Sequence, residues 1–341
     1  MNKEKKMRSL VATMGPFHRL PWWWDDIKHD RNLCPIDYKR IVLKKNQKQT
    51  STLEVFVLFL KLLPVILHIR KKYDFVFTFE CDLTSFIIAF WQTVLRIQKP
   101  KHVILQFIMR EKTDRLSSRL KYAVMKFIYQ SVYKSICSTQ GEVDYYTRVF
   151  EWQSNKAVFV PFHTSPEFFE VKTSDTENYI FSGGSVFRDF GTLFEAIGDN
   201  KYKLVIVCTK RVIETPSQFT NLTVKFDIPL NEFNKLIANS RIVVVSLEEN
   251  NLSAGQTVIL QAMTMGKAVI VTRTVATVDY VEDNKTGILV NPYDPIELRR
   301  AIDMLMRDKE LRERLGTAAK EAVIRQYMPH HYTANVRQAL H

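Results

Sequence analysis

Residues 243–292 read VVVSLEENNLSAGQTVILQAMTMGKAVIVTRTVATVDYVEDNKTGILVNP, and this stretch decides the fold. Its apolar runs Ile242–Val245 and Ala268–Val271 are short, continuous and rich in β-branched residues. Such runs are typical of strands that are covered on both faces of a parallel sheet. The stretch therefore predicts two buried strands with a polar connection between them.

The connection between the two strands contains a predicted helix. Ser253 and Thr257 flank its start, and Gly266 marks its end. The helix N-terminus follows the carboxyl end of a strand, where free backbone N–H groups form an anion site. A turn-rich loop that ends at Gly287 follows the second strand. The stretch thus indicates a ligand that carries phosphate.

The order of motifs in this part of the chain resembles the nucleotide-sugar half of the family 4 glycosyltransferases. The matching positions are Ser246, Gly255, Gln261-Ala262-Met263, Gly266-Lys267-Ala268-Val269-Ile270, Asp279-Tyr280, Asn284, Gly287 and Val290-Asn291-Pro292-Tyr293-Asp294. The resemblance covers about half of the chain. It implies the GT-B architecture, an α/β fold in which two Rossmann-like domains with parallel sheets face each other across a cleft.

The length and the charge of the chain indicate two domains with different partners. The 341 residues are 46% hydrophobic and carry a net charge of +13, and this length is typical of two domains. Residues 1–160 hold 28 Lys and Arg against 14 Asp and Glu, whereas residues 161–341 hold 21 against 22. The four scattered cysteines, with no CxxC pair, predict reduced thiols in a cytosolic protein.

The basic first half predicts contact with an anionic membrane surface. The start of the chain lacks the apolar run of a signal peptide, and the most hydrophobic stretch, Val55–Ile69, is too short to span a bilayer. Basic groups near Trp22-Trp23-Trp24 combine charge attraction with interfacial aromatic residues. The alternative is a glycosyltransferase of high pI with a tryptophan-rich loop in its acceptor cleft. We expect a cytoplasmic protein, peripheral on the inner face of the membrane.

Alternating strands and helices predict two parallel sheets. In the first half, strands are expected at 8–14, 73–79, 102–107, 135–139 and 157–161, and helices at 53–70, 83–97, 116–133 and 141–150. In the second half, further strands are expected at 179–184, 204–209 and around 224–226, and helices at 188–197, 231–238, 296–307 and 309–327. The expected divisions are an acceptor-binding domain at 1–160, a linker at 161–178, a nucleotide-sugar domain at 179–327 and a tail at 328–341 that crosses back.

Two loops of the second half are the predicted donor site. In the first, Gly183, Gly184 and Ser185 follow a strand, and Arg188 offers a permanent cation to a diphosphate; a surface pair of Arg188 and Asp189 at a helix start is the alternative. In the second, small side chains let a ligand approach the helix N-terminus, with N-capping by Ser253 as the alternative. Its residues are Ser253, Ala254, Gly255, Gln256 and Thr257. The resemblance adds base contacts at Thr209, Lys210 and Asp227.

The chain departs from the family where two carboxylates are expected. The family has a Glu on each side of seven residues, and the aligned positions here are Ser253 and Gln261. Gln261 can still pair with ribose hydroxyls, because an amide both donates and accepts. Ser253 cannot supply a negative charge. Glu248 and Glu249 lie on a loop a few residues earlier; one of them replaces the missing carboxylate, or both are solvated loop residues. Glu249 is taken as the catalytic candidate beside Arg188.

The first half supplies the candidate acceptor residues. These are Gly15, His18, Arg19, Trp22, Trp23, Trp24 and Arg110, together with Glu111. The family often has a His after its fourth strand, which is absent here. His18 is the catalytic candidate in its place, against the alternative of an ordinary loop His. No metal-ligand pattern is evident, so a metal-independent site without a cofactor is expected.

The sequence favours an enzyme that moves a sugar from a nucleotide-diphosphate sugar to a lipid-linked or cell-surface glycan acceptor, with retention of configuration. The missing Glu at Ser253 leaves open a non-catalytic GT-B protein that binds a nucleotide or a glycan. A nucleic-acid binder is supported only by the basic first half, because no known nucleic-acid motif accompanies it.

Overall fold

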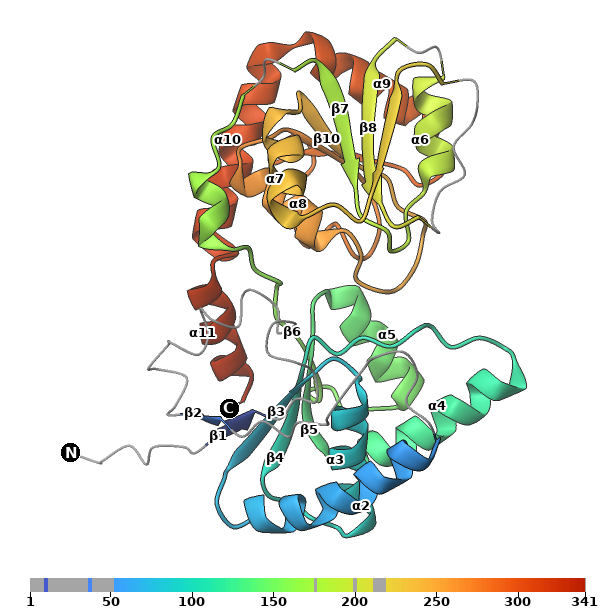
Figure 1. The fold of residues 1–341 in the computed structure, drawn as a ribbon, viewed down its shortest axis with the longest axis vertical. Helices are drawn as coiled ribbons and strands as arrows, with labels where there is room; N and C mark the ends of the chain where they lie inside the picture. Colours follow the sequence, from blue (N-terminus) through green and yellow to red (C-terminus); the bar gives the residue numbers. More distant parts are fainter. Residues whose placement is uncertain are drawn as a thin grey trace, which may run out of the picture. The chain divides into compact units, whose positions relative to one another are not determined.

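The computed structural model describes residues 9–11, 36–38, 52–174, 177–198, 201–210 and 219–340. These residues divide into two compact units (Figure 1). Unit 1 runs to Val160 and is joined by the residues from Thr333 onward, and unit 2 comprises the residues from Pro161 to Tyr332.

Unit 1 is built on a six-stranded parallel sheet in the order β2-β1-β3-β4-β5-β6. Its strands are β1 (Ser9–Val11), β2 (Ile36–Tyr38), β3 (Phe75–Phe79), β4 (Lys101–Leu105), β5 (Val132–Cys137) and β6 (Ala157–Phe159). Its helices are α2 (Thr52–Ile69), α3 (Leu83–Val94), α4 (Leu116–Ile128) and α5 (Gln140–Phe150), with a 3₁₀ turn, η2, at Tyr129–Ser131. Every residue of β3 is buried, because helices cover both faces of a parallel sheet.

The strand β5 begins earlier than its sequence pattern predicts. A helix was expected to continue to residue 133, but α4 ends at Ile128 and β5 begins at Val132. The residues around this boundary, VMKFIYQSVYKSIC, mix apolar and aromatic side chains with polar ones, so that their pattern fits a helix end and a strand alike. Strand β2 was not predicted, because it has only three residues.

Unit 2 has a second six-stranded parallel sheet, in the order β12-β11-β10-β7-β8-β9. Its strands are β7 (Tyr179–Gly183), β8 (Lys203–Cys208), β9 (Leu222–Phe226), β10 (Ile242–Val245), β11 (Val269–Thr272) and β12 (Ile288–Val290). Its helical segments are η3 (Pro166–Glu170), α6 (Phe190–Ile197), α7 (Leu230–Asn239), α8 (Gln256–Thr264), α9 (Pro295–Arg307), α10 (Lys309–Gln326) and α11 (Pro329–Ala339), the last of which extends into unit 1.

The strand order of unit 2 contains a topological switch point. From β7 the chain moves outward to β8 and β9, and it then returns to the other side of β7 to form β10, β11 and β12. In open α/β sheets, ligands bind outside the carboxyl ends of the strands at such a point. The loops that follow β7 and β10 lie at this switch point and are therefore the candidate ligand site.

The predicted α/β class is confirmed, since both sheets are parallel and are flanked by helices (Figure 1). The strand Ile242–Val245 was predicted with its observed bounds, and each of its residues is buried. The edge strand β12 was missed, because its three residues follow the turn-rich loop that ends at Gly287.

Candidate functional site

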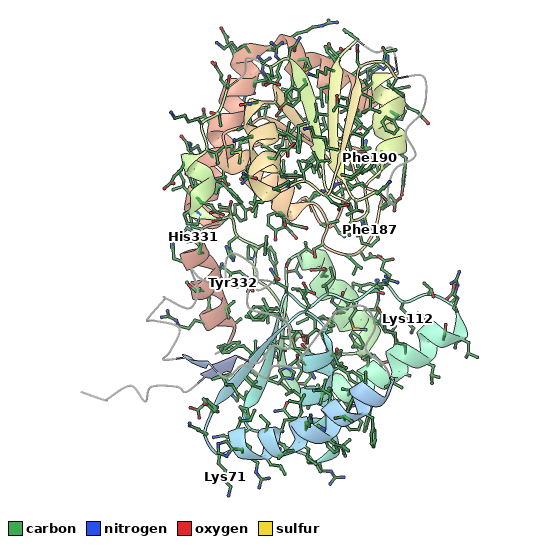
Figure 2. The ribbon with its side chains drawn as sticks, in the orientation of Figure 1. Lys71, Lys112, Phe187, Phe190, His331 and Tyr332 are labelled. Atoms are coloured by element: carbon green, nitrogen blue, oxygen red, sulfur yellow. The ribbon has the colours of Figure 1, made fainter. Side chains whose placement is uncertain are left out.

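The loops after β7 and β10 are joined by their backbones at the switch point. The Asp189 N–H donates to the Ser246 carbonyl at 3.1 Å, and the Glu248 N–H donates to the Phe187 carbonyl at 3.0 Å. Arg188 and Leu247 form an antiparallel bridge between them. Figure 2 labels Phe187 just before Phe190, the first residue of α6. The structure thus brings the two predicted donor loops together.

Arg188 lies buried within this junction, with only 8% of its surface exposed. Its Nε donates to the Gly183 carbonyl at 2.8 Å, and its Nη1 donates to the Val186 carbonyl at 3.3 Å. Among the described residues no carboxylate forms an ion pair with it. Burial lowers the pKa of Arg188 to about 10, so the side chain remains a cation at neutral pH. A buried cation without a protein counter-ion favours an anionic ligand.

The structure also decides between the alternatives for Arg188 and Asp189. Asp189 is the N-cap of α6 and accepts a hydrogen bond from the Thr192 N–H at 2.9 Å. Arg188 precedes this cap and is buried, so the surface pair is wrong for Arg188.

Gly184 lets the Arg188 side chain lie across its own loop, and Gly183 leaves room for the ring of Phe233. Gly184 has a φ of +103°, and a Cβ at this position would lie 2.8 Å from Cζ of Arg188. A Cβ at Gly183 would lie 2.6 Å from Cζ of Phe233. Ser185 Oγ accepts a hydrogen bond from the Thr209 N–H at 2.8 Å, which ties this loop to the end of β8. Ser185 and Thr209 therefore have structural partners as well as their predicted donor role.

The N-terminus of α8 lies at the end of the second predicted donor loop. The helix begins at Gln256, and its N-cap is Gly255 with a φ of +86° and no side-chain hydrogen bond. Ser253 lies two residues before this N-cap. The first turn contains no acidic residue, and the first N–H groups of a helix have no partners within it. Ser253 is half-buried and Thr257 is exposed beside this terminus.

The two glutamines of α8 have different surroundings. Gln256 donates from Nε2 to the Ala276 carbonyl at 2.8 Å, so its side chain supports the loop after β11. Gln261 is 2% exposed, and its Oε1 has no hydrogen-bond partner. Buried amide oxygens are normally paired. The unpaired Oε1 of Gln261 is available for the ligand contact predicted for this residue. The contact itself remains a prediction.

We expect Gln261→Met to separate folding from binding. Removing an unpaired buried acceptor should raise the free energy of unfolding by about 1 kcal/mol, whereas loss of a ligand hydrogen bond should weaken nucleotide binding about tenfold. Gln256→Met is the matched control on the same helix, since it leaves the Ala276 carbonyl unpaired and should destabilise the protein. For both variants, chemical denaturation measures the free energy of unfolding and calorimetry with UDP measures the nucleotide affinity. Unchanged affinity in Gln261→Met would exclude the ribose contact.

Glu248 and Glu249 are exposed on the β10–α8 loop. The Glu249 N–H donates to Tyr293 Oη at 3.0 Å. Tyr293, which has a φ of +58°, therefore fixes the backbone of this loop. Tyr293 lies on the turn after β12. Apart from its place in the family motif, nothing in the sequence predicted its contact with Glu249. Both carboxylates remain candidates for the role of the missing Glu.

The ends of β8 and β9 lie beside each other in the sheet. Lys210 and Asp227 are exposed there, and the Asp227 N–H donates to the Cys208 carbonyl at 3.3 Å. The predicted base-binding residues thus share the carboxyl edge of the sheet with the loop that contains Ser185.

In unit 1, the acceptor candidates that lie within the described residues are Arg110, which is exposed, and Glu111, which is half-buried. Three tyrosines hold the loop of these two residues: Tyr146 bonds the backbone of Met109, Tyr122 donates to the Arg110 carbonyl, and Tyr145 accepts from the Lys112 N–H. Gly15, His18, Arg19, Trp22, Trp23 and Trp24 lie outside the described residues.

Two carboxylates at the end of β3 were missed in the sequence. Glu80 directly follows the strand, with a φ of +53°, and Asp82 caps α3 by accepting from the Ser85 N–H at 2.8 Å. Burial and the charge of Asp82 raise the pKa of Glu80. A strand followed at once by a carboxylate was the available signal.

The described residues contain no group of three or more His, Cys, Asp and Glu side chains that fits a metal ion. The metal-independent site remains a prediction. Within the same residues, Cys81, Cys137 and Cys208 are free thiols.

Comparison with known proteins bears on the family and the fold. Residues 166–322 match the model of the family described as glycosyl transferases group 1, while no curated protein matches the chain. The structure is similar to a glycosyltransferase from Rickettsia africae ESF-5 (TM-score 0.71, 14% identity) and to sucrose-phosphate synthase from Thermosynechococcus elongatus (TM-score 0.70, 15% identity), with 98% of each chain covered in both cases. It is also similar to Anabaena HepE in complex with UDP and glucose (TM-score 0.67, 13% identity), over 98% of this chain and 99% of that one. The chain therefore has the GT-B fold, and most of its unit 2 matches the group 1 glycosyltransferases.

Proposed function

We propose that the protein is a glycosyltransferase that moves a sugar from a nucleotide-diphosphate sugar to an acceptor hydroxyl with retention of anomeric configuration. The observation that carries the proposal is the buried Arg188 cation in the loop after β7, which is joined to the loop that leads to the N-terminus of α8, at the switch point of unit 2. Both groups favour a diphosphate, and both lie within the segment that matches group 1 glycosyltransferases.

In this reaction the protein contributes little as a general base. The bond between the anomeric carbon and the diphosphate oxygen breaks, the acceptor oxygen bonds to that carbon, and the acceptor proton passes to the leaving diphosphate. The protein stabilises the charge that develops on the leaving group and positions the reactants. Arg188 and the first N–H groups of α8 supply the charge stabilisation. Glu249 or Glu248 orients the donor sugar in place of the missing Glu, Gln261 contacts the ribose, and His18 contacts the acceptor.

We propose a lipid-linked or cell-surface glycan as the acceptor, and contact of unit 1 with the anionic inner surface of the cytoplasmic membrane. The basic charge of the first half supports this location. The complex of the structurally similar HepE with UDP and glucose makes UDP-sugars the first donors to test. No metal is assigned to the reaction.

A thermal-shift screen of UDP-, GDP- and ADP-sugars tests the proposal. A ligand that binds the native state raises the melting temperature by mass action, so we expect one nucleotide to stabilise the wild-type protein at millimolar concentration. Proton NMR of the product with the matching donor then reports the anomeric configuration. Failure of every nucleotide to shift the melting temperature or to bind in calorimetry would refute the proposal.

A non-catalytic protein that binds nucleotide is the second candidate, since Ser253 stands where the family places a carboxylate. It predicts a nucleotide-induced thermal shift without slow donor hydrolysis. Hydrolysis by the wild type that is lost in Glu248→Gln or Glu249→Gln would exclude it.

A further inference from the structure

Helix α4 of unit 1 presents an apolar stripe to solvent. Leu116, Leu120, Val124 and Phe127 are between 45% and 80% exposed. Their spacing of four, four and three residues places them on one face of the helix. Tyr122 on the opposite face is buried, as is Ile128 at the end of the helix. In Figure 1, α4 extends outward from the rest of unit 1. Four large exposed apolar side chains in one row indicate an interaction surface.

The charges around this stripe are positive. On the helical wheel Arg119 and Lys126 lie on one side of the stripe and Lys121 lies on the other. Residues 116–128 contain no Asp or Glu. Lys126 pairs with Glu151 at 2.6 Å, whereas Arg119 and Lys121 are exposed. Such a pattern is typical of helices that lie in a membrane interface.

Helix α2 repeats the pattern. Phe56, Leu60 and Leu67 are exposed on one face, and α2 and α4 both pack against α3. Figure 2 labels Lys71 just beyond α2 and Lys112 just before α4. In the sequence, residues 39–51 contain five cations and no acidic residue: Lys39, Arg40, Lys44, Lys45 and Lys48.

We propose that the exposed stripe of α4 docks on an anionic lipid bilayer, with Leu116, Leu120, Val124 and Phe127 in the interface and Arg119 and Lys121 at the phosphate level. The charge pattern selects this partner, because cations beside apolar side chains complement anionic headgroups above acyl chains. A second copy of the chain would place these cations against each other. Within the described residues no helix is sufficiently long and apolar to cross a bilayer. This inference locates the membrane contact included in the proposed function.

Vesicle sedimentation tests the inference with the full chain. The wild type should bind equimolar phosphatidylcholine and phosphatidylglycerol vesicles, and bind pure phosphatidylcholine vesicles much less. The triple variant Leu116→Ser, Leu120→Ser and Phe127→Ser should lose binding at least roughly tenfold. Arg119→Gln and Lys121→Gln should each weaken it roughly fivefold. These side chains are exposed, so the melting temperature should not fall.

The matched control is the double variant Ile296→Ser and Ile324→Ser, which removes apolar side chains of unit 2 that are 63% and 53% exposed. It should bind vesicles like the wild type. Equal binding by the wild type and the α4 triple variant would overturn the inference, as would wild-type dimers that the triple variant converts to monomers without any change in vesicle binding. The thermal shift by UDP-sugar tests the proposed function separately, and the α4 variants should retain it.

Discussion

Gly184→Ala is expected to reduce kcat/KM for the nucleotide-sugar donor by on the order of 100-fold, although it removes no functional group. The φ of Gly184 is +103°, and an added Cβ would lie 2.8 Å from Cζ of Arg188 and closer still to Nη2. The guanidinium must therefore leave the position in which its Nε bonds the Gly183 carbonyl. Because charge stabilisation depends on preorganised geometry, a displaced cation loses most of its effect.

The control for this variant is Gly191→Ala, seven residues along the same connection. Gly191 lies in the first turn of α6, and an added Cβ would meet only Asp189 Oδ1, at the ordinary contact distance of 3.5 Å. Alanine favours a helix by about 1 kcal/mol over glycine, so this variant should be equally or more stable and fully active. Steady-state kinetics and calorimetry with the donor compare the two. Wild-type donor binding in Gly184→Ala would show that the position of Arg188 does not matter.

The elements around the donor loops could be predicted because their patterns are unambiguous. The four residues Ile242–Val245 are apolar and β-branched between polar neighbours, which leaves no competing helix. The 3.6-residue pattern of α9 and α10 is similarly clear, and their observed bounds, Pro295–Arg307 and Lys309–Gln326, lie within one residue of those expected. Parallel β-α alternation then placed both donor loops at the carboxyl edge of one sheet.

The features of the donor site that could not be predicted from the sequence depend on contacts between loops. The burial of Arg188 arises from its bonds to the Gly183 and Val186 carbonyls and from its bridge to Leu247, none of which has a local pattern. The sequence offered Ser253, a residue type that usually caps, as the N-cap of α8, an alternative to its predicted donor role. The structure places Gly255 there instead, with a positive φ that glycine adopts readily. Both differences lie at the donor loops, where function rather than local propensity selects the residues.

The acceptor side was harder to predict for a different reason. Its candidates were chosen by residue type on loops without periodicity, and only Arg110 and Glu111 lie among the described residues. The structure shows that the outermost row of α4 is apolar, with cations at its sides. The orientation of an amphipathic helix requires knowledge of which face the fold buries, and both faces of α4 contain apolar residues.

Arg188→Met is expected to lose function without losing stability. Because burial lowers the pKa of Arg188 from 12.5 to about 10, holding the cation in this place costs the free protein about 3 kcal/mol relative to an exposed guanidinium. Methionine removes that cost and fills a similar volume. It leaves the Gly183 and Val186 carbonyls without their partner, a loss of about 1 kcal/mol for each hydrogen bond. The two effects nearly cancel, so the free energy of unfolding should stay close to that of the wild type.

The donor reaction should respond very differently to the same change. Removing one group that stabilises a developing negative charge lowers kcat by about 100-fold to 1,000-fold, and the thermal shift by the nucleotide should shrink with it. Arg188→Lys keeps the charge but lacks the planar fork that holds both carbonyls and a diphosphate, so its activity should lie between those of the wild type and Arg188→Met. Denaturation, thermal shift and turnover on the three proteins measure this order. If Arg188 had only a structural role, the opposite result would be seen. Arg188→Met would unfold more easily than the wild type, and its folded fraction would bind nucleotide normally.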